Sequence, residues 1–142
     1  MTNGYTYSVI SYPSKDLPET YVPLVFSRWL RSFKGGHPHL KKVDPDAYYK
    51  NYHGFIQILL SKPDSQVRLA VLSDDHDVVL GFSVCREDVL DYVHVQVDHR
   101  KQGIGKSLIP KNITTFTHST NLSNGIWLNN DHYKHLKFNP YA

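Results

Sequence analysis

The stretch that decides the fold is VHVQVDHRKQGIGKSLI, residues Val93–Ile109. Its first part alternates valine with other residues, and this period of two is typical of a β-strand with one buried face. A basic turn with Gly103 and Gly105 follows, and the pattern then changes to that of a helix. A strand, a glycine turn and a helix start predict a phosphate-binding turn, because the first helical turn leaves backbone N–H groups unpaired.

Spacing separates three such turns. A P-loop, G-x-x-x-x-G-K-[ST], would need a glycine where Arg100 stands. A Rossmann turn, G-x-G-x-x-G/A, would need a small residue where Leu108 stands. The third pattern, R/Q-x-x-G-x-G/A, is satisfied by Arg100, Gly103 and Gly105. Because so short a motif also occurs in ordinary turns, its flanking elements must decide.

Composition sets the outer limits. A chain of 142 residues predicts one domain, residues 1–142, and 40% hydrophobic residues are ordinary for a globular protein. The net charge of +3 suits an anionic small ligand and does not require nucleic acid. The lone Cys85 excludes an internal disulfide, and we expect a cytoplasmic protein without signal peptide or membrane span.

Periodicity predicts the elements around the motif. Residues 44–63 form the clearest helix, with Asp44 as N-cap and Pro45 at the first helical position. The other expected elements, in chain order, are a strand at 5–12, a helix within 17–36, a loop at 37–42, strands at 66–73 and 78–87 around a turn at 74–77, a strand at 89–97, a helix at 104–112, a strand at 113–119, a helix at 121–135 and a strand or tail at 136–142.

This order, β-α-α-β-β-β-α-β-α-β, together with V-x-V-x-x-R and R-x-x-G-x-G, resembles the GNAT N-acetyltransferases. The resemblance implies an α/β (α+β) fold with a twisted, mixed, mostly antiparallel sheet flanked by helices. The patterns FSRWLRSF, YYKNYHGFIQILL and FNPY are also similar to small phage-encoded proteins of this type.

The resemblance implies acetyl-CoA as the co-substrate. In the family the fourth strand has an irregularity that separates it from the fifth, and the pantetheine arm pairs with the exposed backbone there. The corresponding groups here belong to Val93, Val95 and Val97, although many relatives have proline where Val97 stands. The coenzyme pyrophosphate would be held by the turn, whose residues are Arg100, Lys101, Gln102, Gly103, Ile104, Gly105 and Lys106.

Three side chains are candidates for the proton transfers. A base on or near the fourth strand would take the proton of the amine, and Asp91 and His94 are the candidates. Because they are three residues apart, a flat strand would place them on opposite faces. The resemblance implies that Tyr133 protonates the departing thiolate, although Lys137 replaces the glycine that precedes the family's phenylalanine.

Other polar residues give weaker indications. His37 and His39 lack the partners and spacing of a zinc site, so we expect no metal. The basic edge formed by Arg28, Arg31 and Lys34 is either solvated or borders the acceptor site.

The sequence therefore predicts an N-acetyltransferase that moves an acetyl group from acetyl-CoA to a primary amine of an acceptor not defined by the sequence. The alternative is a catalytically silent protein of the same fold that binds a protein or nucleic-acid partner, nucleic acid being the less expected. We expect a monomer or a homodimer.

Overall fold

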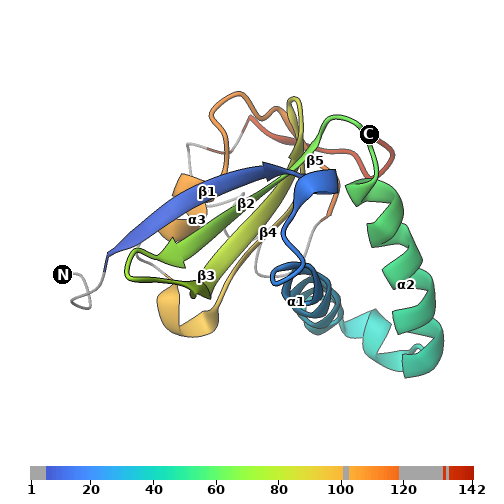
Figure 1. Cartoon of the computed structure of the whole chain (residues 1–142). Coiled ribbons are helices and arrows are strands. Elements are labelled where there is room, and N and C mark those ends of the chain that lie inside the picture. Colours follow the sequence, from blue (N-terminus) through green and yellow to red (C-terminus); the bar gives the residue numbers. More distant parts are fainter. Residues whose placement is uncertain (1–5, 101–102, 119–132, 134) are drawn as a thin grey trace.

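The computed structural model describes residues 6–100, 103–118, 133 and 135–142, and these build a six-stranded sheet in the order β1-β2-β3-β4-β5-β6 (Figure 1). The first three pairings are antiparallel, and β4–β5 and β5–β6 are parallel. The strands and α-helices are β1 (Tyr7–Pro13), α1 (Val22–Gly35), α2 (Pro45–Leu60), β2 (Ser65–Leu72), β3 (Asp75–Arg86), β4 (Val89–Val95), α3 (Ile104–Leu108), β5 (Thr115–Phe116) and β6 (Lys137–Phe138). The predicted fold class is confirmed.

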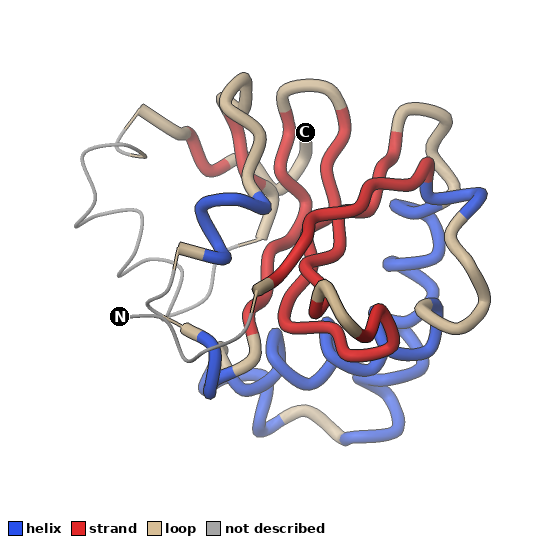
Figure 2. The backbone as a smooth tube through the Cα atoms, turned by 60° about the vertical axis from the view of Figure 1, so that its left-hand side comes forward, coloured by secondary structure: helices blue, strands red, loops and turns tan. Residues whose placement is uncertain are grey.

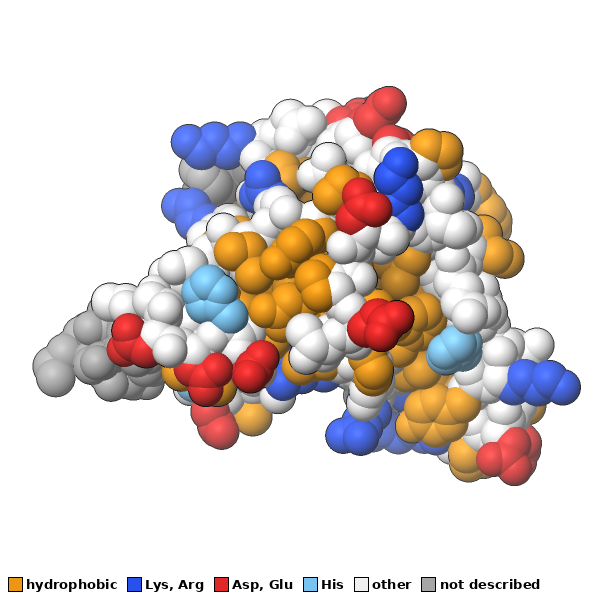
Figure 3. Space-filling view, in the orientation of Figure 1, with side chains coloured by type: hydrophobic (Ala, Val, Ile, Leu, Met, Phe, Trp, Pro, Cys, Tyr) orange, Lys and Arg blue, Asp and Glu red, His pale blue; other side chains and the backbone are white. Residues whose placement is uncertain are grey.

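Helices α1 and α2 cover one face of the sheet, and α3 lies on the other (Figure 2). The larger core lies under α1 and α2, where Trp29 and Ile56 are fully buried against Phe82 of β3. The predicted N-cap of α2 is present, because the Asp44 carboxylate accepts a hydrogen bond from the Ala47 amide at 3.0 Å. Figure 3 shows hydrophobic side chains gathered at the centre of one face, between the sheet and these helices.

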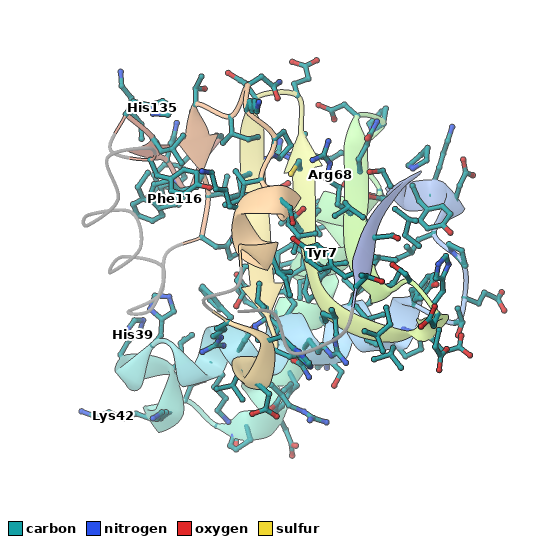
Figure 4. All side chains as sticks on the ribbon, turned by 90° about the vertical axis from the view of Figure 1, so that its left-hand side faces the viewer. Tyr7, His39, Lys42, Arg68, Phe116 and His135 are labelled. Atoms are coloured by element: carbon teal, nitrogen blue, oxygen red, sulfur yellow. The ribbon has the colours of Figure 1, made fainter. Side chains whose placement is uncertain are left out.

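The opposite face carries a smaller core around α3. Ile104 and Leu108 are buried there against Leu80, and the Ser83 hydroxyl donates a hydrogen bond to the Leu108 carbonyl at 2.7 Å. Tyr7, labelled in Figure 4, extends from β1 to this helix. Helix α3 is thus fixed on the sheet directly beside β4.

Several expected boundaries were wrong. A 3₁₀ turn occupies Pro38–Lys42, where we expected a loop. Helix α3 ends at Leu108 instead of 112, because Pro110 forces the preceding Ile109 into an extended conformation. The β2–β3 hairpin is tighter than expected, since Leu72 already pairs with Asp75. The helix expected at 121–135 lies almost wholly outside the described residues.

Among the residues that the structure describes, none of the helices is both long and apolar enough to cross a membrane.

Candidate active site

Strands β4 and β5 diverge soon after they meet. They pair only at Val89 with Thr115 and at Leu90 with Phe116. One more backbone bond follows, from the Thr117 amide to the Leu90 carbonyl at 3.1 Å, and no later one joins β4 to the described part of β5. Beyond Leu90, the side of β4 that faces away from β3 pairs with no described strand. We call this unpaired side the gap, with its closed end at Leu90 and its open end at Val95.

A β-bulge at Asp91 lies where the gap begins. Val84 and Cys85 are adjacent in β3, yet they pair with Tyr92 and Leu90, so Asp91 is an extra residue in β4. The irregularity implied by the family resemblance is thus present, and it lies six residues before Val97.

After the bulge, the backbone groups of two β4 residues, Val93 and Val95, face the gap. His94 pairs with Phe82 of β3, and the Gln96 amide donates to the Leu80 carbonyl at 2.9 Å. Because backbone groups alternate along a strand, those of Val93 and Val95 point away from β3 and toward the gap. Their side chains contribute to the core under α3.

Val97 does not continue this strand. It lies in a 3₁₀ turn, Val97–His99, and its side chain is 71% exposed. The expectation that Val97 shares the buried valine face was wrong, because β4 ends at Val95 and the chain turns at Gln96.

The glycine turn lies at the open end of the gap. Arg100 donates its Nε–H to the Val95 carbonyl at 2.9 Å, which ties the turn to the strand. Gly103 has φ +83°, a left-handed conformation that favours glycine. Gly105 has no such strain, and a Cβ there would lie 3.6 Å from Val95 Cγ2, an ordinary contact. The fold therefore requires glycine at position 103 but not at position 105.

The remaining residues of the turn differ in burial. Ile104 is buried under the sheet and Lys106 is exposed at the surface. Lys101 and Gln102 lie outside the described residues.

The carboxylate of Asp91 is fully buried and held from two sides. It accepts hydrogen bonds from Arg86 Nε at 2.7 Å and Nη2 at 2.9 Å, and from Thr117 Oγ1 at 2.9 Å. Arg86 and Thr117 thus already occupy both carboxylate oxygens. This arrangement fits a structural role at the bulge better than the role of a base.

His94 lies on the α1–α2 side of β4, in contact with Phe82. Its Nε2 is 2.9 Å from Gln96 Oε1, and burial lowers the pKa of the imidazole. The expectation that Asp91 and His94 face opposite sides was wrong, since the bulge turns the Asp91 side chain to the α1–α2 side as well.

His118, which sequence reasoning missed, lies immediately after the last backbone bond that joins the described parts of β4 and β5. Its ring contacts five aromatic rings from α1, α2 and β4, with centroid distances of 5.1–5.8 Å: Trp29, Phe33, Tyr52, Phe55 and Tyr92. Burial lowers the pKa of His118 to about 4. Its Nδ1 lies 2.9 Å from Thr117 Oγ1. The only sequence signal was a histidine in the expected strand 113–119.

Tyr133 is buried in a satellite core with Leu90 and Phe116, and burial raises the pKa of its hydroxyl. The basic edge of α1 divides into two kinds of residue. Arg28 donates to the Val79 carbonyl at 2.7 Å, whereas Arg31 is exposed.

Metal binding and thiol chemistry are two further possibilities for this fold. No group of three potential metal ligands occurs among the described residues. Cys85 is buried, and burial raises the pKa of its thiol to about 11. A thiol in that state is a poor nucleophile.

Comparison with known proteins gives a structural match only. No protein-family model and no curated protein matches the sequence. A solved structure from Pyrococcus furiosus, described provisionally as an acetyl transferase, superposes with a TM-score of 0.59 at 14% identity, over 72% of this chain and 69% of that one.

Two looser matches have TM-scores below 0.5. Apo YjaB from Escherichia coli has a TM-score of 0.48 at 18% identity, over 72% of this chain and 61% of YjaB. The aminoglycoside N-acetyltransferase AAC(6')-Iy, solved with CoA, has a TM-score of 0.49 at 17% identity, over 89% of this chain and 84% of that one. The protein has the fold of the GNAT acetyltransferases, as its sequence motifs implied.

Proposed function

We propose that this protein is an N-acetyltransferase that moves an acetyl group from acetyl-CoA to a primary amine. The observation that carries the proposal is the gap between β4 and β5, where the backbone groups of Val93 and the N–H of Val95 face away from β3 beside a glycine turn. The Val95 carbonyl is already held by Arg100. A gap of this kind accepts a ligand that itself carries amides, because such a ligand can pair with the strand as another strand would.

Pantetheine is such a ligand, and its place in the gap follows from the turn. The coenzyme pyrophosphate lies at Gly103–Gly105, where the start of α3 presents backbone N–H groups. Lys101, Gln102, Ile104 and Lys106 complete this turn in the proposal, with Lys106 adding positive charge. The pantetheine then runs along β4 from Val95 toward the closed end, so the acetyl group lies near Asp91 and Tyr92.

The reaction needs a base for the amine and a proton for the thiolate. His94 and Asp91 remain predictions for the base, and Tyr133 remains a prediction for the acid. Of these, Asp91 is the least suited, because Arg86 already holds its carboxylate.

Charge near the helices limits the acceptor. The end of α1 and the 3₁₀ turn Pro38–Lys42 bring together four basic side chains, which are Arg31, Lys34, Lys41 and Lys42. We propose that these side chains border the acceptor site, where they would repel polycationic acceptors and favour neutral or acidic amines.

The test replaces Gly105 with valine and measures acetyl-CoA binding by calorimetry. Because the Cβ itself fits against Val95, we expect the variant to fold and to lose at least tenfold in affinity, which is about 1.4 kcal/mol. The matched control is Gly54→Val in α2, where a Cβ meets nothing within 4 Å; its affinity should equal that of the parent. A parent protein without affinity for millimolar acetyl-CoA would refute the proposal and favour a silent binding protein.

A further inference from the structure

Building on the proposed function, we propose that His118 takes the proton from the acceptor amine. We further propose that a hydrogen-bonded chain from His118 through Thr117 to Asp91 holds its ring in the tautomer that this step requires.

The tautomer follows from counting hydrogens. The Thr117 hydroxyl has one hydrogen, and it donates this hydrogen to Asp91 Oδ1 at 2.9 Å, because an ionised carboxylate can only accept. The weaker contact of the same hydroxyl, with the Asp91 carbonyl at 3.4 Å, also requires Thr117 to be the donor. Thr117 Oγ1 can therefore only accept from His118, so Nδ1 carries the ring hydrogen and Nε2 carries the lone pair.

The position of His118 matches the site of the chemistry. Among the described residues, Thr117 makes the last backbone bond between β5 and β4, so His118 lies at the closed end of the gap. The pyrophosphate turn lies at the other end, four strand residues away, or roughly 13 Å at about 3.3 Å per residue. A coenzyme that lies along β4 therefore brings its thioester toward His118.

The surroundings of His118 indicate the kind of acceptor. Its ring is walled by aromatic side chains, and Phe55 among them is 41% exposed. The carboxylate linked to it through Thr117, Asp91, is already paired with Arg86, so it does not offer a free negative charge to a cationic amine. We therefore infer a neutral primary amine on an aromatic or apolar carrier.

The proton balance is simple. The amine nitrogen attacks the thioester carbonyl, the C–N bond forms and the C–S bond breaks. The nitrogen gives its surplus proton to His118 Nε2, and that proton then leaves with the coenzyme A thiolate as the free thiol. No other reactant is needed.

His94 is the competing base, and its geometry is less suitable. Its Nε2 faces Gln96 Oε1, so this nitrogen donates its hydrogen to the amide. It also lies three residues further along β4, toward the pyrophosphate end of the gap.

The first experiment needs no ligand. A long-range ¹H–¹⁵N NMR spectrum of the labelled protein at pH 7, with the His118 signals assigned through His118→Gln, reports which ring nitrogen is protonated. We expect Nδ1–H in the parent and in Thr117→Ser, and loss of this preference in Thr117→Val, which keeps the shape of threonine without its hydroxyl. An Nε2–H ring in the parent would overturn the inference.

The second experiment measures thiol release from acetyl-CoA with aniline, an aromatic primary amine that is uncharged at pH 7, as the probe amine. We expect His118→Gln to lower kcat at least 100-fold while acetyl-CoA binding is unchanged. Thr117→Val should also lower kcat, and Thr117→Ser should restore it. His53→Gln, a histidine stacked on Phe26 of α1, is the matched control and should keep full activity.

The outcomes separate the two proposals. If the parent binds no acetyl-CoA, the proposed function fails, whatever the NMR spectrum shows. If the parent binds acetyl-CoA but does not acetylate the probe, or if His94→Gln abolishes turnover while His118→Gln does not, the proposed function survives and this inference fails.

Discussion

Arg100 donates its Nε–H to the carbonyl oxygen of Val95 at 2.9 Å, so the motif arginine ties the glycine turn to the end of β4. The bond closes the short loop that contains the 3₁₀ turn Val97–His99. The arginine therefore braces the turn through the backbone, which is a role that requires no ligand.

Arg100→Ala should consequently lower the free energy of unfolding even without coenzyme. Loss of one hydrogen bond from a charged donor costs about 1.5–3 kcal/mol, and we expect the lower part of this range because Arg100 is only half-buried. Urea denaturation measures the change. Lys106→Ala removes an equal charge from an exposed position of the same turn and should cost less than about 0.5 kcal/mol. Equal losses in both variants would contradict the bracing role.

The two glycines of the turn should respond differently to alanine. Gly103→Ala forces a Cβ into the left-handed region at φ +83°, which costs about 1–2 kcal/mol. Gly105→Ala meets only an ordinary contact and improves helix propensity, so stability should stay level or rise. Thermal unfolding of both variants without coenzyme checks this, and a loss at Gly105 as large as at Gly103 would contradict it.

Removing one partner of the buried ion pair Arg86–Asp91 should lower the free energy of unfolding strongly. Replacing both partners with apolar residues should lower it much less. Asp91→Asn leaves the guanidinium buried without its counter-charge, and such losses are about 3–5 kcal/mol. The double variant Arg86→Met with Asp91→Leu removes both charges and should recover most of this loss. Chemical denaturation of the single and double variants measures the free energy of unfolding of each. A double variant as unstable as the single one would show that the bulge itself needs the pair.

Stability should fall as the pH drops below neutral, partly because of His118. Burial lowers the pKa of this imidazole to about 4, against about 6.5 in an unfolded chain, so between these values the unfolded state binds more protons. The contribution is complete above pH 6.5 and is lost as the pH falls toward 4. The charged and titratable groups that act on His118 are Asp91, Arg86 and His37.

His118→Phe should therefore flatten the slope of unfolding free energy against pH between pH 7 and 5. Some slope should remain, since burial also lowers the pKa of His94. Urea titrations at several pH values measure it. An unchanged slope would mean that His118 is not held neutral in the folded protein.

The order of the main elements could be predicted from the sequence because each element carries its own local signal. Asp44 and Pro45 mark the start of α2, and both occupy the expected positions. A run rich in aromatic and β-branched residues predicted β1, and the strand pattern of the later runs predicted β2 to β4. The same signal placed Val97 in β4 incorrectly, since periodicity in the sequence continues after the strand has ended.

The site was harder to predict, because its parts meet only in three dimensions. Arg100, Gly103 and Gly105 form a local motif that the sequence displays. The chain from His118 through Thr117 to Asp91 joins two strands that are separated by a turn and a helix, and no spacing rule connects them. Alternation in the sequence also does not reveal that Asp91 of β4 has no pairing partner in β3.

That extra residue, Asp91, has a consequence for protein engineering. Side chains along a β-strand point alternately to the two faces of the sheet. One inserted residue therefore moves every side chain after it to the opposite face. Residues Tyr92–Val95 keep their proper sides only while the insertion is present. A β4 segment transplanted from a protein without the bulge would turn its valines toward α1 and its histidine toward α3. A chimera that exchanges this strand must therefore keep the number of residues in β4, including the bulge residue. Only then do the motif side chains point to the correct faces of the sheet.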